Sequence, residues 1–248
     1  QVLVQIIQNF IGKKRLPMLI IDSQNTVANK KSFSARGAGI LGLSNFGHSH
    51  TFALSDDMEL DIKKINQFTE EFLDQPKIIF GFTFIIWKYF IKQLENNGCK
   101  LNLNNSTLFH SGGWKKIQSE AVDNLVFKKM VKKLTSINKV HNFYGMVEQV
   151  GSIFVECEHG YLHTPSYSDV IIRDPINFEN LGINKKGLVQ VLSMLPHSYP
   201  GHSLLTEDLG TLLGEDNCKC GRKGKYFQIH GRIKKSENRG CSDTFKDV

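Results

Sequence analysis

The sequence contains 248 residues, enough for one large domain or two smaller ones, and 40% of them are hydrophobic, which is enough to form a buried core. No stretch of about 18 apolar residues is free of charges, so no membrane span is predicted. The formal net charge of +7 comes mostly from scattered lysine pairs such as Lys63-Lys64 and Lys132-Lys133. This distribution indicates solvated surfaces and predicts no nucleic-acid partner.

The N-terminal segment, residues 1–17, places its apolar residues before its charges and has a helical pattern. A secretory signal has the opposite order, so this segment is predicted to be a helix within a domain. The chain has five cysteines, an odd number. Together these features favour a reducing, cytoplasmic location, where cysteines serve as ligands or nucleophiles rather than as disulfides.

Residues 1–150 are expected to form an α/β subdomain, because short apolar runs alternate with helical patterns. Strands are expected at residues 16–22, 50–54, 76–82, 105–113 and 139–145. Helices are expected at residues 32–46, 58–73, 83–98 and 121–134. This alternation predicts a parallel sheet with helices on both faces.

The pattern changes after Gly145. Six short apolar segments separated by turn residues follow, at residues 151–156, 160–165, 169–174, 187–195, 204–213 and 225–232. They predict a smaller β-rich subdomain, antiparallel or barrel-like, over residues 151–248. Nothing near the boundary resembles a flexible linker, so the two subdomains are expected to pack together.

Two of the expected parallel strands end in glycine turns, LFHSGGWKK at 108–116 and NFYGMVEQVG at 142–151. Ligands of parallel sheets bind beyond the carboxyl ends of the strands. Glycine allows a ligand to approach the backbone, an adjacent aromatic ring can stack on a base, and a nearby carboxylate can hold the magnesium ion of a nucleotide. Each turn by itself is weak evidence, because a glycine pair after a strand is usually a simple turn and a Tyr-Gly pair is common.

Two later segments place charged residues at strand ends, LLTEDLG at 204–210 and HGRIKKSENRG at 230–240. Asp208 is compatible with an ordinary turn or with a carboxylate that accepts hydrogen bonds from both ribose hydroxyls. Arg232 is compatible with a surface hairpin or with an arginine that reaches phosphate or ribose. Taken singly, these segments leave both interpretations open.

The order of these segments resembles the adenylate-forming ligases, which activate a carboxylic acid as an acyl-AMP. The resemblance implies the α/β fold of their N-terminal domain, with ATP and Mg²⁺ as cofactors. It implies that Tyr144 stacks on adenine, that Glu148 serves the magnesium ion, and that Asp208 holds the ribose with Arg232 nearby. The nucleotide site would also include four residues of the glycine turns, Gly112, Gly113, Gly145 and Met146.

Longer segments are similar to the acyl-protein synthetase (LuxE-type) family and cover most of residues 75–248. These segments are FGFTFIIW, HSGGWKK, NFYGMVEQVGSIFVEC, YLHTPSYSDVIIRDP, LPHSYPGHSLLTEDLG, CKCGRKGKYFQIHGR and RGCSDT. The resemblance implies ATP-dependent activation of a fatty or other carboxylic acid and transfer of the acyl group to the thiol of Cys241. The acyl group would then pass to a partner such as an acyl reductase. Cys241, Glu148 and Arg232 are the implied catalytic residues, and the basic residues before Cys241 would lower the pKa of its thiol.

The sequence departs from the adenylate-forming pattern at one point. Those enzymes have a loop rich in Ser, Thr and Gly that binds phosphate, upstream of the segments above. The glycine-containing segment at residues 33–42, FSARGAGILG, has no hydroxyl cluster. Together with the helical pattern at residue 1, this predicts that the sequence is N-terminally truncated.

Four residues in two turns are candidate zinc ligands. Cys218 and Cys220 form a Cys-x-Cys knuckle before a glycine, and Cys157 and His163 lie upstream in ECEHGYLHTP. If the two turns meet, they make a closed Cys₃His site of the structural type, with His159 as a competing fourth ligand. Ligases of the phenylacetate-activating type resemble this arrangement and hold zinc there. The spacings are not the common C-x₂-C pairs, so two unrelated turns with reduced thiols are the alternative.

Two other functions are compatible with parts of the pattern. An acid–CoA ligase would use the same nucleotide segments without a covalent enzyme intermediate. A non-catalytic, zinc-stabilised basic binding module would explain the charge and the cysteine knuckle. It would not explain the order of the YGMVE, TEDLG and GR segments.

Overall fold

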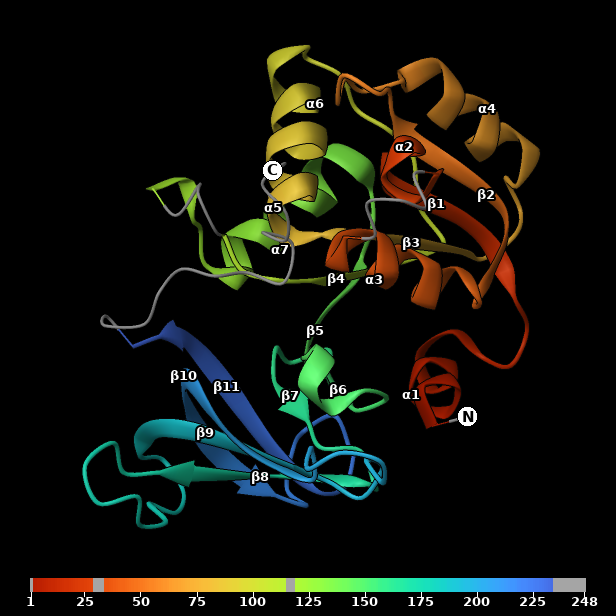
Figure 1. The fold of residues 1–248 in the computed structure, drawn as a ribbon. Helices are drawn as coiled ribbons and strands as arrows, with labels where there is room; N and C mark the ends of the chain where they lie inside the picture. The colour runs from red at the N-terminus through yellow and green to blue at the C-terminus, as the bar shows by residue number, and fades with distance from the viewer. Residues whose placement is uncertain (1, 29–33, 115–118, 234–248) are drawn as a thin grey trace, which may run out of the picture. The chain divides into compact units, whose positions relative to one another are not determined.

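A computed structural model of the chain describes residues 2–28, 34–114 and 119–233, and the statements on structure concern these residues (Figure 1). The chain divides into two compact units. One comprises residues 7–140, and the other comprises residues 141–233 together with residues 2–6. No helix in the described ranges combines the length and apolar character that crossing a membrane requires.

The unit of residues 7–140 contains a parallel sheet with the strand order β2-β1-β3-β4. The strands are β1 (Leu16–Ser23), β2 (Gly47–Leu54), β3 (Lys77–Phe82) and β4 (Ser106–Ser111). The predicted apolar runs are therefore strands. β2 starts earlier than its apolar run because Gly47 and His48 also pair with β1, opposite Leu16 and Pro17. The parallel arrangement predicted from strand–helix alternation is confirmed.

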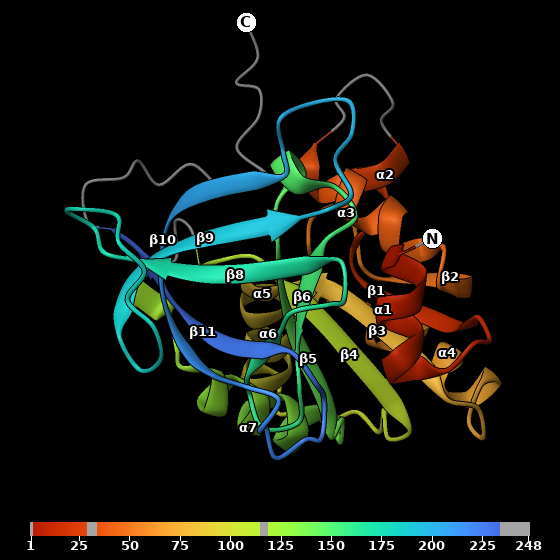
Figure 2. The same cartoon turned by 90° about the horizontal axis from the view of Figure 1, so that it is seen from below.

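Helices lie on both faces of this sheet (Figures 1 and 2). The helices of the first half of the chain are α1 (Val2–Ile11), α2 (Asn25–Ala28), α3 (Ala35–Ser44), α4 (Ile62–Glu71), α5 (Thr83–Ile85), α6 (Lys92–Asn96) and α7 (Asn124–Thr135). A π-helical segment, η1 (Ile86–Ile91), joins α5 to α6. The helix predicted at 83–98 is therefore one continuous helix with a wider central turn.

The core of this unit follows from the alternation of side chains along the strands. Leu19 and Ile21 of β1 belong to a buried cluster with apolar residues of α4, η1, α6 and α7. Met18 and Ile20 are equally buried and point to the opposite face, because successive strand residues alternate. A strand that is buried on both faces appears in the sequence as a continuous apolar run, and LPMLII is such a run.

Lys77, the first residue of β3, is only 1% exposed. Its ammonium donates hydrogen bonds to the backbone carbonyl oxygens of Phe72 at 2.9 Å and Gln75 at 3.0 Å, and to that of Leu73 at 3.4 Å. These carbonyls follow α4, where helix carbonyls lose their partners. The lysine therefore closes the turn between α4 and β3, and burial lowers the pKa of its ammonium.

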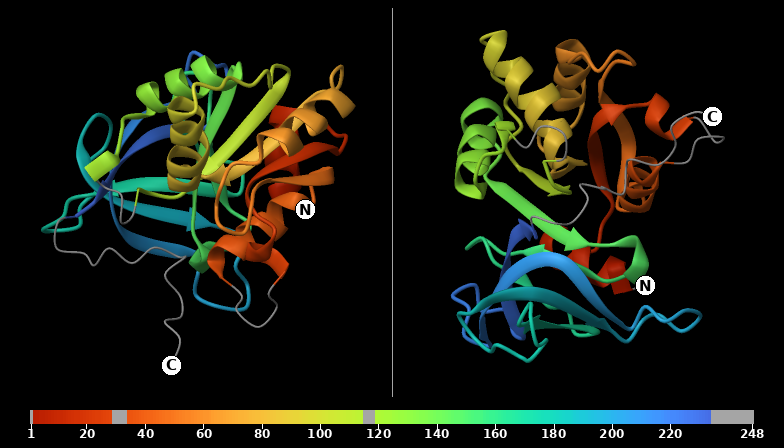
Figure 3. Two further views of the ribbon diagram at one scale, coloured as in Figure 1. Left: turned by 90° about the horizontal axis from the view of Figure 1, so that it is seen from above. Right: turned by 60° about the vertical axis from the view of Figure 1, so that its left-hand side comes forward.

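The second unit is an antiparallel sheet, which the chain enters within β5 (Figure 3). Its strands lie in the order β5-β6-β7-β11-β10-β9-β8. They are β5 (Lys139–Gly145), β6 (Ile153–Glu156), β7 (Leu162–His163), β8 (Ser168–Arg173), β9 (Lys186–Ser193), β10 (Ser203–Glu215) and β11 (Lys225–Arg232). The six strands predicted after Gly145 are all present. Phe154 and Phe227 pack edge to face at the centre of this unit, with ring centroids 5.3 Å apart.

Candidate functional site

Asp208 is placed by an irregular stretch of β10. The pairing of β10 with β9 shifts register between Leu205 and Leu209. Within this stretch the hydroxyl of Thr206 donates to the carbonyl of Val189 at 2.7 Å and accepts from the amide of Asp208 at 3.2 Å. Such irregularities redirect side chains and occur often beside active sites. The TEDLG segment is therefore an irregular stretch within a strand and not a turn between strands.

Three residues that the sequence singled out meet at this point. The hydroxyl of Tyr144 donates a hydrogen bond of 2.7 Å to Oδ2 of Asp208. Nε of Arg232 lies 3.7 Å from Oδ1 of Asp208, because the two residues are opposite each other in the β10–β11 pair. The Asp208 side chain is 19% exposed, so part of the carboxylate is accessible. One carboxylate, one phenol and one guanidinium thus converge from β10, β5 and β11.

The Tyr144 phenol is held in its neutral form. Burial raises its pKa, and the negative charge of Asp208 raises the pKa further. The ring is tilted against Phe154 and perpendicular to Phe227, with centroids 6.2 and 6.5 Å away. The phenol therefore acts as a hydrogen-bond donor over the whole ordinary pH range. Its predicted stacking on adenine stays a prediction.

The turn that carries Glu148 is anchored by the buried side chain of the next residue, Gln149. Glu148 is exposed and lies in a short 3₁₀-helix, η3 (Val147–Gln149), after Gly145 and Met146. The buried side-chain amide of Gln149 donates to the carbonyl of Gly201 at 2.9 Å. A Cβ added at Gly201 would lie 2.7 Å from the carbonyl oxygen of Glu148, so a glycine is required for this close approach. The exposed carboxylate is available to a cation, and its magnesium role stays a prediction.

Gly112 and Gly113 follow β4 and belong to the unit of residues 7–140. Gly112 has a φ of +87°, which L-residues with a side chain rarely adopt, whereas a Cβ at Gly113 would meet no atom within 4 Å. The end of β4 is fixed by Thr83, whose hydroxyl contacts Nδ1 of His110 at 3.0 Å. The glycine turn is therefore a stretch of backbone at the carboxyl end of the parallel sheet, with open space beside Gly113.

The four predicted zinc ligands come together. The candidate ligand atoms of Cys157, His163, Cys218 and Cys220 all lie within 4.8 Å of one another. Sγ of Cys157 is 4.0 Å from Sγ of Cys218, and Sγ of Cys220 is 3.4 Å from Nε2 of His163. Tetrahedral zinc with its usual bond lengths holds its ligand atoms about 3.5–4 Å apart, so this Cys₃His set fits the ion. His159, the competing ligand, is exposed and is not part of the set.

The strands explain why the two cysteine turns meet. His163 in β7 is paired with Tyr226 in β11, which places the loop before β11 beside the β6–β7 turn. Arg222 and Glu158 also join the two turns by a bidentate ion pair of 2.6 and 3.1 Å. This pair lowers the pKa of the Glu158 carboxyl to about 2, mainly through the hydrogen bond from Arg222. Burial raises the pKa of the Cys157 thiol to about 11.

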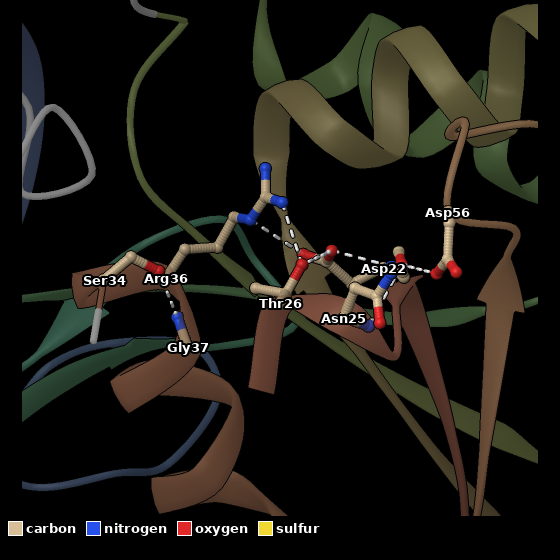
Figure 4. A network of polar contacts seen from close by, with 8 residues as sticks. Asp22, Asn25, Thr26, Ser34, Arg36, Gly37 and Asp56 are labelled. Carbon is tan, nitrogen blue, oxygen red and sulfur yellow. Dashed lines mark hydrogen bonds and ion pairs between the residues drawn. The ribbon is translucent and has the colours of Figure 1, made fainter. Parts of the chain in front are cut away.

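A buried ionic network at the end of β1 was not predicted from the sequence, where residues 16–22 were expected only to form a strand (Figure 4). Asp22 is 1% exposed, and its Oδ2 lies 3.2 Å from Nε of Arg36. Thr26 bridges the two side chains, because its hydroxyl donates to Asp22 Oδ1 at 2.6 Å and accepts from Arg36 Nη2 at 2.9 Å. The backbone amide of Ser23 also donates to Asp22 Oδ1, at 2.7 Å. Arg36 lies inside the 33–42 segment that was considered only for its glycines.

The predicted site residues therefore fall into separate groups. Tyr144, Asp208 and Arg232 form one cluster, and the Cys/His set forms a second one in the same unit. The glycine turn of β4 lies in the other unit. Cys241, the predicted acyl acceptor, lies outside the described residues.

The fold is that of the adenylate-forming ligases. A 2-hydroxyisobutyryl-CoA ligase solved with 2-HIB-AMP and CoA superposes with a TM-score of 0.66 at 16% identity, covering 94% of this chain and 49% of the ligase. The amide bond synthetase McbA from Marinactinospora thermotolerans gives 0.58 at 14% identity, with coverage of 92% and 43%. A luciferase-like enzyme from the mealworm Zophobas morio gives 0.57 at 18% identity, with coverage of 95% and 53%. This chain thus spans about half of each of these solved chains or less.

The sequence matches the acyl-protein synthetase, LuxE, family over residues 1–248. Because the match covers the whole chain, the protein belongs to this family. The resemblance noted over residues 75–248 is thereby confirmed and extends to the N-terminal part. A search of curated protein sequences found no significant match.

Proposed function

We propose that the protein activates a fatty or other carboxylic acid with ATP as an acyl-AMP and transfers the acyl group to the thiol of Cys241. Family membership and the adenylate-forming fold support the activation. The single observation that carries the proposal is the convergence of Tyr144, Asp208 and Arg232, in the positions where the family resemblance puts adenine and ribose contacts. Tyr144 and Asp208 are 64 residues apart in the sequence, so their contact depends on the fold and not on local sequence.

The first half-reaction joins the acid to the nucleotide. A carboxylate oxygen of the acid attacks the α-phosphorus of ATP, and pyrophosphate leaves. In our proposal Asp208 accepts hydrogen bonds from the ribose hydroxyls, and Arg232 places positive charge beside them. Glu148 would hold Mg²⁺, which neutralises phosphate charge when it is bound.

The second half-reaction moves the acyl group. The thiolate of Cys241 attacks the acyl carbon, the bond to the phosphate oxygen breaks, and AMP leaves with the electron pair. A thioester results, which a partner such as an acyl reductase would accept. Lys234, Lys235 and Arg239 precede Cys241 in the sequence and would favour the thiolate.

The Cys₃His set is proposed to hold a structural zinc ion. All four protein positions are filled, so the site leaves no open coordination position for substrate. The residues would tie the β6–β7 turn to the loop before β11. The role is therefore stabilisation of the sheet that carries Asp208 and Arg232, and not chemistry.

An acid–CoA ligase is the second candidate. Its support is the 2-hydroxyisobutyryl-CoA ligase, whose solved complex contains 2-HIB-AMP and CoA. In that case the thiol of CoA would replace that of Cys241, and no acyl-enzyme would accumulate. Incubation with ATP, Mg²⁺, fatty acid and CoA separates the two, because free acyl-CoA forms only in the second case.

The activation step is tested by acid-dependent release of pyrophosphate and AMP from full-length protein given ATP, Mg²⁺ and a panel of fatty acids. The proposal predicts release that depends on the acid and that Asp208→Asn strongly reduces. Release that is absent with every acid, or that is unchanged in Asp208→Asn, would contradict it.

A further inference from the structure

The buried network at the end of β1 leaves part of the Arg36 side chain exposed. Asp22 contacts Nε of Arg36 and Thr26 contacts Nη2, so both partners lie along the same part of the group. In Figure 4 the remaining nitrogen, Nη1, points away from both of them. The Arg36 side chain is 26% exposed. Arginine has further N–H donors at Nη1 and Nη2, and these fit a planar carboxylate.

The pair is fixed more firmly than a surface ion pair. Asp22 accepts from Ser23 and Thr26, and Ser23 in turn donates its hydroxyl to Asp56 at 2.8 Å. Burial raises the pKa of Asp22 despite the opposing effect of Arg36. A buried ion pair often contributes no more stability than apolar residues of the same size, so stability alone is a weak reason for one here. An orienting role for a functional guanidinium is a better physical reason.

The network also lies where a parallel sheet binds ligands. Asp22 is the penultimate residue of β1, at the carboxyl end of that strand. One helical turn after Arg36, Gly39 faces the ring of Phe82 at the end of β3, and an added Cβ would lie 2.9 Å from it. A Cβ added at Gly112 would lie 3.3 Å from Cδ1 of the same ring. Gly39, one turn after Arg36 on α3, and the glycine turn after β4 therefore border one apolar ring.

We propose that the guanidinium of Arg36, oriented by Asp22, binds the carboxylate of the acid that the protein activates. The charged head would lie at Arg36, and the half-buried ring of Phe82 would offer apolar surface to the chain. The inference rests on the function proposed above, because it names the residue that recognises the acid. It assigns Arg36 to the acid and not to the phosphates of ATP.

The test is direct binding by isothermal titration calorimetry, without ATP, so that it does not depend on catalysis. Octanoate, decanoate and tetradecanoate are titrated into the wild-type protein, and the best-bound acid is compared with the alcohol of equal chain length. The variants are Arg36→Met and the matched control Arg173→Met, whose arginine hydrogen-bonds Gln190 in the other unit. Since Arg36→Met leaves Asp22 without its cation, the double variant Asp22→Asn, Arg36→Met is measured in parallel.

We expect both Arg36 variants to weaken acid binding by about ten- to a hundredfold, as the loss of a charged hydrogen bond does, with the alcohol affinity changed by less than about twofold. Arg173→Met should bind as the wild type does. The proposal is overturned if the wild type binds no acid, or if the variants keep the acid or lose acid and alcohol equally. Steady-state activity separates the remaining cases. If the Arg36 variants raise the KM for ATP and leave the KM for the acid unchanged, Arg36 binds phosphate and the proposal is overturned. Arg36-dependent acid binding without pyrophosphate release would preserve this site and contradict the proposed activity.

Discussion

The hydroxyl of Tyr144 donates a hydrogen bond of 2.7 Å to the carboxylate of Asp208, 64 residues further along the chain. The bond joins the end of β5 to the irregular stretch of β10. It therefore fixes the distance between the residue expected to contact adenine and the residue expected to contact ribose.

Tyr144→Phe should raise the KM for ATP by about three- to tenfold while leaving kcat nearly unchanged. The change removes the hydrogen bond to a carboxylate but keeps the aromatic ring, so orientation of Asp208 is lost and stacking is retained. Steady-state kinetics at saturating acid measure the effect. Tyr167→Phe is the control, since Tyr167 is 40% exposed and lies outside the cluster. An unaltered KM for ATP, or a loss confined to kcat, would argue against this role.

The protein should contain one zinc ion per chain. Cys218→Ser should lower both the zinc content, measured by elemental analysis, and the midpoint of thermal unfolding by about 5 °C or more, because binding energy adds to folding energy. Cys99→Ser is the matched control, since Cys99 is half-buried, its sulfur donates to the backbone carbonyl of Asn97, and it lies outside the Cys/His set. Purified protein that lacks zinc and gains no stability when zinc is added would contradict the prediction.

Gly112→Ala should destabilise the protein by about 1–2 kcal/mol, since an L-residue is strained at a φ of +87°. Gly113→Ala, one residue away, should change the stability by less than about 0.5 kcal/mol, because an added Cβ there meets no atom within 4 Å. Denaturant unfolding of both variants provides the comparison. Equal effects would show that the turn does not depend on the conformation of Gly112.

The contribution of Asp22 to stability should fall as the pH rises. Burial raises its pKa above the ordinary value of 3.8, so the native state binds a proton more readily than the unfolded state does. Stability contributed by such a group is present below the unfolded pKa and declines until the pH passes the raised native pKa. The free energy of unfolding is measured for the wild type and for Asp22→Asn from pH 3 upward, in pH steps of about one unit. The difference between the two proteins is followed as a function of pH. A difference that is constant or grows with pH would exclude this behaviour.

Much of the fold was predictable because it depends on local patterns. The apolar run LPMLII indicated a strand, and the structure shows that this strand, β1, is buried on both faces. The alternation of strands and helices indicated parallel pairing, which the register of β1 with β2 and β3 confirms. The π-helical segment Ile86–Ile91 was not predictable, because a helical pattern of apolar residues does not distinguish one backbone hydrogen-bond register from another.

The site residues were predictable only where they belong to a recognisable sequence motif. The cysteine spacings left His159 and His163 open, and the pairing of β7 with β11 decides for His163. The contact of Asp22 with Arg36 had no signal, because an aspartate at a strand end is usually a simple boundary. Contacts between residues far apart in sequence depend on how the strands pair, which spacing alone does not determine.

Acyl transfer to Cys241 is tested most directly by the intact mass of full-length protein incubated with ATP, Mg²⁺ and a fatty acid, compared with Cys241→Ser. We expect a covalent acyl adduct on the wild type, mapped to Cys241 after digestion, and no adduct on Cys241→Ser, which still forms AMP slowly. An adduct that persists in Cys241→Ser, or a wild type that forms acyl-AMP and never an acyl-enzyme, would contradict it.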